Sequence, residues 1–260
     1  MFRERNESGD GYLQRLDARV KVVLTLSLIL GILLTPERAS PAYPLLWALT
    51  ASLAAASSIN VWRLARRGGL ALPFVMASAA LPFTMPGQPV FEVAGLAVTD
   101  AGLLRFMSIL VKSWLSVQAA LLLSMTTPFT ELLRAFHSLR VPETLIAIVG
   151  FMYRYLDTLS DEARRLLRAR SARSAAIRGR KLGGSLIWRA RTAGGMVGSL
   201  FLRSYERSER IYAAMLSRGY DGRARALSSP PLRPTALAYG LIPFLALCLI
   251  ELLALLWWAK

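Results

Sequence analysis

Apolar residues along the chain are gathered into five runs that polar or turn-forming residues separate. A helix needs about 20 mainly apolar residues to cross a bilayer, within a usual range of about 17 to 25. Runs that reach or approach this length lie at residues 20–35, 43–62, 70–83, 106–125 and 235–258. The third run is short and contains Pro73 and Pro82, which favours a kinked span or a re-entrant piece. The pattern predicts an all-α, polytopic membrane protein of about five transmembrane helices.

Basic residues lie on one side of these spans, and Lys and Arg accumulate in the cytoplasmic loops of membrane proteins. They occur before the first span at Arg3, Arg5, Arg15 and Arg19, and after the second span at Arg63, Arg66 and Arg67. Residues 68–104 contain neither Lys nor Arg, so we expect the loop at 86–102 to lie outside the cell. The distribution predicts a multi-pass protein of the cell inner (plasma) membrane with a cytoplasmic N-terminus. No small-residue cleavage site follows the first run, so we expect it to remain as a span.

A long polar segment separates the fourth and fifth spans. Residues 126–232 carry 19 Lys and Arg against 8 Asp and Glu, and thus supply +11 of the net charge of +16. Cap signals and glycines predict three helices here: one to about Leu139, one from Pro142 to about Ala176, and one ending at Gly219. We therefore expect three regions. They are a membrane bundle of four spans at 1–125, cytoplasmic helices at 126–232, and a C-terminal transmembrane helix at 233–260.

Two of these cytoplasmic helices end in similar arrangements of arginine. The two sets, 45 residues apart, are Arg165, Ala169, Arg173 and Ser174, and Arg210, Ala214, Arg218 and Gly219. The spacing of four places each Arg, Ala and Arg on one helical face. The small residue after the last Arg would let the surface of a partner approach closely. Alternatively, these arginines only complement the helix dipole and the anionic surface of the membrane.

Composition excludes several classes of protein. Apolar residues make up 54% of the chain and the mean hydropathy is +0.42, above an ordinary soluble domain. One cysteine, Cys248, and one histidine, His137, cannot form an internal disulfide or a His-rich metal site. No Gly-x-x-x-x-Gly-Lys-Ser/Thr phosphate loop occurs, so the chain should not hydrolyse ATP itself. We expect no catalytic residues, cofactor or bound metal.

Two functions of other classes fit parts of the pattern. The charge of the segment at 126–232 would suit a membrane-anchored nucleic-acid-binding protein, but that segment lacks interleaved aromatics and any known binding motif. An intramembrane enzyme would need paired carboxylates, whereas Glu251 is the only acidic residue well inside a span. We therefore expect membrane lipid as a partner and no nucleic acid.

Several segments resemble one known family. They are Leu16-Asp-Ala-Arg-Val-Lys21, Met152-Tyr-Arg-Tyr155, Ala172-Arg-Ser174 and the long block Arg203-Ser-Tyr-Glu-Arg-Ser-Glu-Arg-Ile-Tyr-Ala-Ala-Met-Leu-Ser-Arg-Gly-Tyr-Asp-Gly222. Over about residues 12–225 the chain is similar to the transmembrane coupling component of energy-coupling factor transporters, and most of all to its cobalt-import type, the CbiQ family. The same family serves nickel and vitamins, which is the alternative for the substrate.

The resemblance implies a non-catalytic scaffold with two kinds of partner: cytoplasmic ATPase subunits and a substrate-binding membrane subunit. In the family, two coupling helices end in Ala-Arg-Gly-like triplets that dock on the ATPases. The matching triplets here are Ala172, Arg173 and Ser174, and Ser217, Arg218 and Gly219. Ser replaces Gly in the first triplet and Ala in the second, so both positions keep a small residue.

Overall fold

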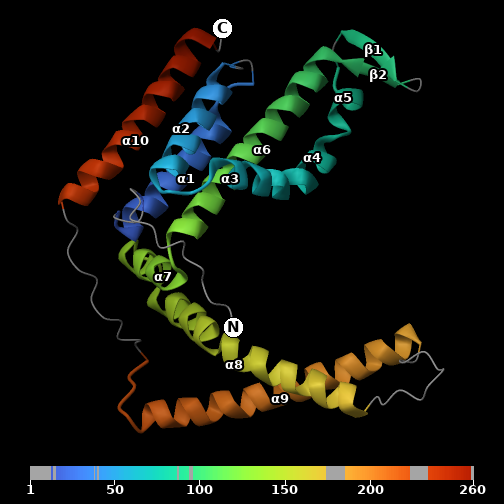
Figure 1. Cartoon of the computed structure of the whole chain (residues 1–260), viewed down its shortest axis with the longest axis vertical. Helices are drawn as coiled ribbons and strands as arrows, with labels where there is room; N and C mark the ends of the chain where they lie inside the picture. The colour runs from blue at the N-terminus through green and yellow to red at the C-terminus, as the bar shows by residue number, and fades with distance from the viewer. Residues whose placement is uncertain are drawn as a thin grey trace. The chain divides into compact units, whose positions relative to one another are not determined.

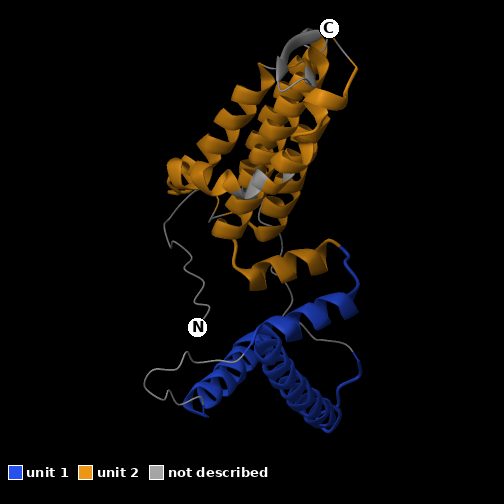
Figure 2. Cartoon of the chain, turned by 90° about the vertical axis from the view of Figure 1, so that its right-hand side faces the viewer, with its two compact units in different colours: residues 1–3, 140–228 blue, residues 4–139, 229–260 orange. Residues whose placement is uncertain are grey.

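The computed structural model describes residues 13, 16–37, 39, 41–86, 88–93, 96–173, 185–222 and 234–258. The chain divides into two compact units, which Figure 2 shows in different colours. One unit contains residues 140–228 with 1–3, and the other contains residues 4–139 with 229–260. The second unit joins the first and last predicted regions, which are far apart in the sequence.

Four long helices form the bundle of the second unit (Figure 1). They are α1 (Ala18–Leu34), α2 (Ala42–Ala56), α6 (Asp100–Thr126) and α10 (Pro234–Leu253), which continues as a π-helical turn at Ala254–Trp258. Their shared core contains Ile32, Leu46 and Leu115, each with no exposed surface. Large apolar side chains cover the outside, above all on α10. The prediction of an all-α fold is confirmed.

Two of the described helices are long and apolar enough to cross a membrane, Asp100–Thr126 and Leu237–Leu256. They correspond to the predicted fourth and fifth spans. Helix α1, with 17 residues, covers the predicted first span, and α2 is a shorter apolar helix of 15 residues.

The predicted second span at 43–62 is wrong as a single helix, because α2 ends at Ala56. The hydroxyl of Ser57 donates to the carbonyl of Leu53, and Ser58 has a positive φ of 58°. Asn60 then starts a new helix, α3 (Val61–Arg67), because its side-chain oxygen accepts the N–H groups of Trp62 and Arg63. Polar caps inside an otherwise apolar run therefore divide it.

The predicted third span at 70–83 is also broken. A 3-10 turn (Gly68–Ala71) leads into α4 (Leu72–Ser78) and α5 (Leu81–Thr84), and α4 and α5 pack against α6. The expected loop at 86–102 contains a hairpin, in which β1 (Pro89–Val93) pairs antiparallel with β2 (Leu96–Thr99). Helix α6 begins directly after β2, where the hydroxyl of Thr99 accepts the N–H of Gly102.

The two lysines of the predicted spans bond to helix carbonyls within the bundle. Lys21 is only 3% exposed, so it does not reach out to the membrane surface. Its Nζ donates to the carbonyl of Thr126, at the end of α6, over 3.2 Å. The Nζ atom of Lys112 donates to the carbonyl of Leu33 near the end of α1 over 3.2 Å. Each amine therefore donates to a carbonyl near a helix C-terminus, where the last carbonyls have no partner within their own helix.

The end of α6 leads into α7 (Phe129–Ser138), which packs against α1 and buries Ala135. The other unit consists of α8 (Glu143–Arg173) and α9 (Leu186–Leu216), each 31 residues long. Neither helix contains a buried residue. Gly194, Gly195 and Gly198 of α9 face open space, because a Cβ added at any of them would meet no described atom beyond its own stretch of helix within 4 Å.

Candidate docking site on α8 and α9

The first predicted triplet lies at the end of α8. Arg173 is the last residue of this helix, and both Ala172 and Arg173 are exposed, while Ser174 lies outside the described residues. Arg173 forms no hydrogen bond or ion pair with any residue that the structure describes. The neighbouring Arg170 differs, because its guanidinium lies 5.9 Å from the ring centroid of Trp188 on α9. Of the two arginines, Arg173 is the one whose side chain remains available to a partner.

The second triplet forms the turn that ends α9. The N–H of Gly219 donates to the carbonyl of Leu216 over 2.9 Å, and that of Tyr220 donates to Met215 over 3.0 Å. This pair of bonds is a Schellman motif, which needs a left-handed residue at its turn. Gly219 supplies it with a φ of 81°, and a side chain there would meet no described atom within 4 Å. Gly219 is therefore required by the backbone conformation, and the turn holds Arg218 at the tip of the helix.

Ser217, Arg218 and Gly219 are all exposed, and Arg218 has no side-chain hydrogen bond or ion pair within the described ranges. The structure does not bring the two triplets together. Trp188, near the start of α9, contacts Arg170, near the end of α8, so the helices run antiparallel. Arg173 and Arg218 consequently lie at opposite ends of the pair and present two separate cationic points.

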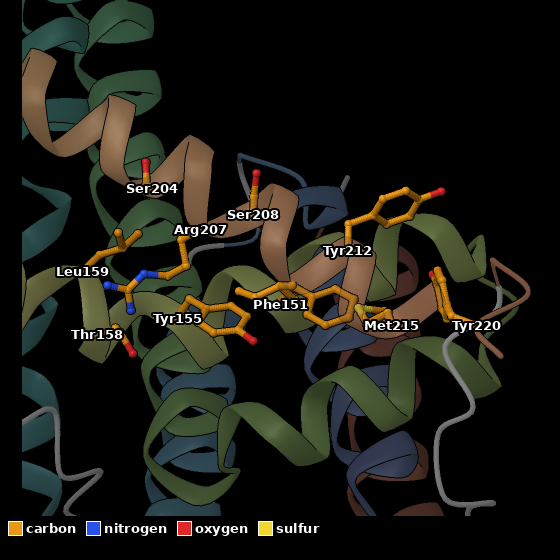
Figure 3. A pocket seen from close by; sticks show the side chains of 11 residues that line it. Phe151, Tyr155, Thr158, Leu159, Ser204, Arg207, Ser208, Tyr212, Met215 and Tyr220 are labelled. Atoms are coloured by element: carbon orange, nitrogen blue, oxygen red, sulfur yellow. The ribbon is translucent and has the colours of Figure 1, made fainter. Parts of the chain in front are cut away.

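A cavity of about 340 Å³ lies between α8 and α9 (Figure 3). Its walls are mainly aromatic and aliphatic, with one cation, Arg207. Tyr155 of α8 and Tyr212 of α9 line it together with Tyr220, the residue directly after the second triplet. The cavity is therefore continuous with the turn that presents Arg218.

One ion pair joins the two helices near their middles. An Nη1 atom of Arg203 on α9 donates to Oε1 of Glu162 on α8 over 2.6 Å. The Glu162 side chain is 19% exposed and that of Arg203 is 57% exposed, so the pair is partly shielded from water. Further along α9, Glu209 accepts a hydrogen bond from the exposed Tyr205 hydroxyl and thereby raises the pKa of that tyrosine.

Sequence reasoning did not identify the cavity or the Glu162–Arg203 pair. Tyr155 and Arg203 both belong to segments that carry the family resemblance, but the sequence alone assigns neither residue a structural role. A contact between residues 41 positions apart depends on how two helices pack, which periodicity along one helix does not indicate. Among the described residues, no His, Cys, Asp and Glu side chains gather into a group of three that could hold a metal.

A helical bundle with an apolar exterior, joined in one chain to two long helices without buried residues, is typical of a membrane protein. Comparison with known proteins agrees with this class. The profile of the CbiQ cobalt transport protein family matches residues 10–228. The chain belongs to this family.

Similar proteins cover from two thirds to nearly all of the chain. An uncharacterized protein from Methanocaldococcus jannaschii is 26% identical over 97% of this chain and 86% of its own length. The energy-coupling factor transporter transmembrane protein EcfT from Thermosediminibacter oceani is 24% identical over 88% of this chain and 87% of its own length. The cobalt transport protein CbiQ from Rhodobacter capsulatus is 28% identical over 66% and 69%, respectively. Members of this family are non-catalytic transmembrane components of transporters, so the chain is a membrane transport protein.

Proposed function

We propose that the chain is the coupling subunit of an energy-coupling factor importer, which transmits the motions of cytoplasmic ATPase subunits to a separate substrate-binding membrane subunit. The observation that carries this proposal is the pair α8 and α9. Two 31-residue helices without a buried residue expose apolar faces that a protein partner could cover. Each of them also ends in an exposed arginine without a described partner. The names of the relatives from T. oceani and R. capsulatus support the same assignment.

Arg173 and Arg218 would each enter an acidic groove on an ATPase subunit. A guanidinium can form two parallel, charge-assisted hydrogen bonds with a carboxylate, in a fork geometry that Lys cannot reproduce. Because the two arginines lie at opposite ends of an antiparallel pair, each would meet a different ATPase subunit. In this proposal α8 and α9 are cytoplasmic, and the bundle spans the plasma membrane several times with the N-terminus inside.

Cobalt is the substrate that we propose, because the matching family is described as cobalt transport proteins. Nickel or a vitamin is the alternative within the same role. Uptake of radiolabelled cobalt and nickel by cells that express the chain with its ATPase and substrate-binding subunits would separate them. If unlabelled nickel at an equal concentration removes most of the cobalt uptake, the preferred substrate is nickel.

The docking role is tested by pull-down of the ATPase subunits with detergent-solubilised variants. Truncating one partner of a buried charge pair commonly costs about 2–5 kcal/mol, and a rim charge costs much less. Arg173→Ala and Arg218→Ala should each weaken ATPase association and uptake severely, and the double variant should abolish both. Arg173→Lys and Arg218→Lys should be poor substitutes.

Arg168→Ala provides the matched control, because Arg168 is an exposed arginine of α8 outside both triplets. It should have little effect at equal membrane levels. Equal and mild losses for Arg168, Arg173 and Arg218 would show that diffuse positive charge is sufficient, and the specific docking role would then be rejected.

A further inference from the structure

The short helix α3 carries a cationic and aromatic surface that the docking of partners on α8 and α9 does not use. Three of its seven residues are arginine: Arg63, Arg66 and Arg67. Arg66 and Arg67 are exposed, and Trp62 at the start of the helix is 77% exposed. An indole with so much of its surface exposed is unusual in water, whereas Trp is enriched where a membrane meets water.

The orientation of α3 is fixed from its inner side. Leu64 has no exposed surface, and the carbonyl of Ala65 accepts the indole N–H of Trp114 on α6 over 3.3 Å. The residue after the helix, Gly68, lies so close to this indole that an added Cβ would be 2.6 Å from its Nε1 atom. The helix therefore cannot roll, and Arg66 and Arg67 are held on the outer surface.

The level of α3 in the bundle follows from α6. An Nη1 atom of Arg67 lies 3.8 Å from the sulfur of Met125, and α6 ends at Thr126. The buried Lys21 also bonds to Thr126. If α6 crosses the bilayer, its last turn lies where the hydrocarbon meets the headgroups, and the Arg67 side chain reaches this level from α3, whose backbone lies beside Trp114, nearer the middle of α6 (Figure 1).

Among the residues that the structure describes, no carboxylate pairs with Arg66 or Arg67. Residues 38–91 contain neither Asp nor Glu. Two arginines that are adjacent in sequence and have no acidic partner among the described residues, on the same short helix as an exposed indole, are complementary to a phosphate group with an acyl chain attached.

We propose that Arg66, Arg67 and Trp62 form a binding site for an anionic phospholipid, in which the two guanidinium groups bind the headgroup phosphate and the indole lies against the glycerol region. The site lies on the bundle and needs no partner protein, so it does not depend on the coupling role. A bound lipid would hold this part of the bundle at a fixed depth relative to the headgroups of one leaflet.

The test is a lipid titration of the purified full-length chain in mild detergent, followed by native mass spectrometry with phosphatidylglycerol and phosphatidylcholine of equal acyl length. The wild-type chain should bind phosphatidylglycerol in preference. At about 1 kcal/mol for each basic residue near a membrane surface, R66Q/R67Q should reduce this preference roughly 30-fold. R165Q/R168Q, which removes two exposed arginines of α8, is the matched control and should leave the preference unchanged.

A second measurement avoids any effect of the arginine substitutions on folding. Headgroup-proximal brominated phosphatidylglycerol should quench the tryptophan fluorescence of the wild-type chain more than the phosphatidylcholine analogue, and W62F should remove the difference. The proposal is overturned by a wild-type chain with no preference for the anionic lipid, by equal reductions in R66Q/R67Q and R165Q/R168Q, or by quenching that W62F leaves unchanged.

Discussion

Lys21 shows how one buried side chain can connect two helices of the bundle. Its buried amine reaches the last carbonyl of α6, and α1 is thereby tied to the point where α6 ends. Hydrogen bonds that involve a charged group contribute about 1.5–3 kcal/mol, and a buried acceptor left alone costs a comparable amount. Lys21 therefore stabilises two helices at once.

Replacing this lysine by methionine keeps its length and removes the donor. We expect Lys21→Met to lower the free energy of unfolding by about 1.5–3 kcal/mol, because the Thr126 carbonyl loses its partner. Thermal unfolding in detergent measures the effect. Lys112→Met is the control, since Lys112 bonds to Leu33 from a partly exposed position and should cost less. Equal losses for both variants would contradict the role of burial.

Gly219 allows a second test at a single residue. Its φ of 81° is a conformation that costs other residues about 1–2 kcal/mol. Gly219→Ala should therefore fray the turn that holds Arg218 and weaken ATPase pull-down. Gly194→Ala, at an exposed glycine inside α9 with open space around it, should be neutral or slightly stabilising. A Gly219→Ala variant that binds the ATPases like the wild type would show that the turn is dispensable.

At the scale of elements, α8 and α9 contact each other sparsely along their length. The Glu162–Arg203 pair joins the two helices near their middles, so it favours the angle at which they meet. Exposed ion pairs contribute about 0.2–1 kcal/mol, and the partly shielded Glu162 places this pair toward the upper end.

A charge exchange tests this role. Glu162→Arg and Arg203→Glu should each weaken ATPase association, because like charges then face each other at the crossing. The double variant restores an opposite pair and should recover most of the binding. The coupling free energy from the double-mutant cycle isolates the contact. Additive losses in the double variant would show that the two residues act independently.

Long elements were predictable from the sequence, and boundaries set by polar caps were not. Helices α6 and α10 are long apolar runs without an internal cap, so hydropathy predicted them well. The run at 43–62 contains Ser57 and Asn60, whose side chains bond at the end of one helix and the start of the next, and a hydropathy average conceals such residues. The β1–β2 hairpin, with strands of five and four residues, is too short to stand out from a loop.

The candidate site was predictable only in part. The spacing of arginines identified both helix tips, because a helical face is a property of one local segment. The cavity that Tyr155 and Tyr212 share, and the burial of Lys21, arise from contacts between segments far apart in sequence. A single sequence does not show directly which distant segments are in contact.

At the scale of the whole molecule, the orientation in the membrane decides which partners each unit can meet. In a Cys248→Ser background, Gln88→Cys places a thiol next to the hairpin and Arg168→Cys places one on α8, both at exposed positions. An impermeant thiol reagent added to intact cells should label Gln88→Cys and leave Arg168→Cys unlabelled until lysis. The reverse pattern would overturn the proposed topology.

The helices of the bundle differ greatly in length. At about 1.5 Å per residue, the 15 residues of α2 extend about 22 Å and the 27 residues of α6 about 40 Å, whereas the hydrocarbon of a typical bilayer is about 30 Å thick. Because hydrophobic mismatch concerns the apolar stretch of a helix, the apolar run of α6 at 106–125 matches the bilayer at about 30 Å, whereas α2 is too short for it. Lipids beside α2 must thin or tilt, at a cost of fractions of a kcal/mol per Å. The protein should consequently be less stable in bilayers of long acyl chains, with the deformation concentrated at the short helix.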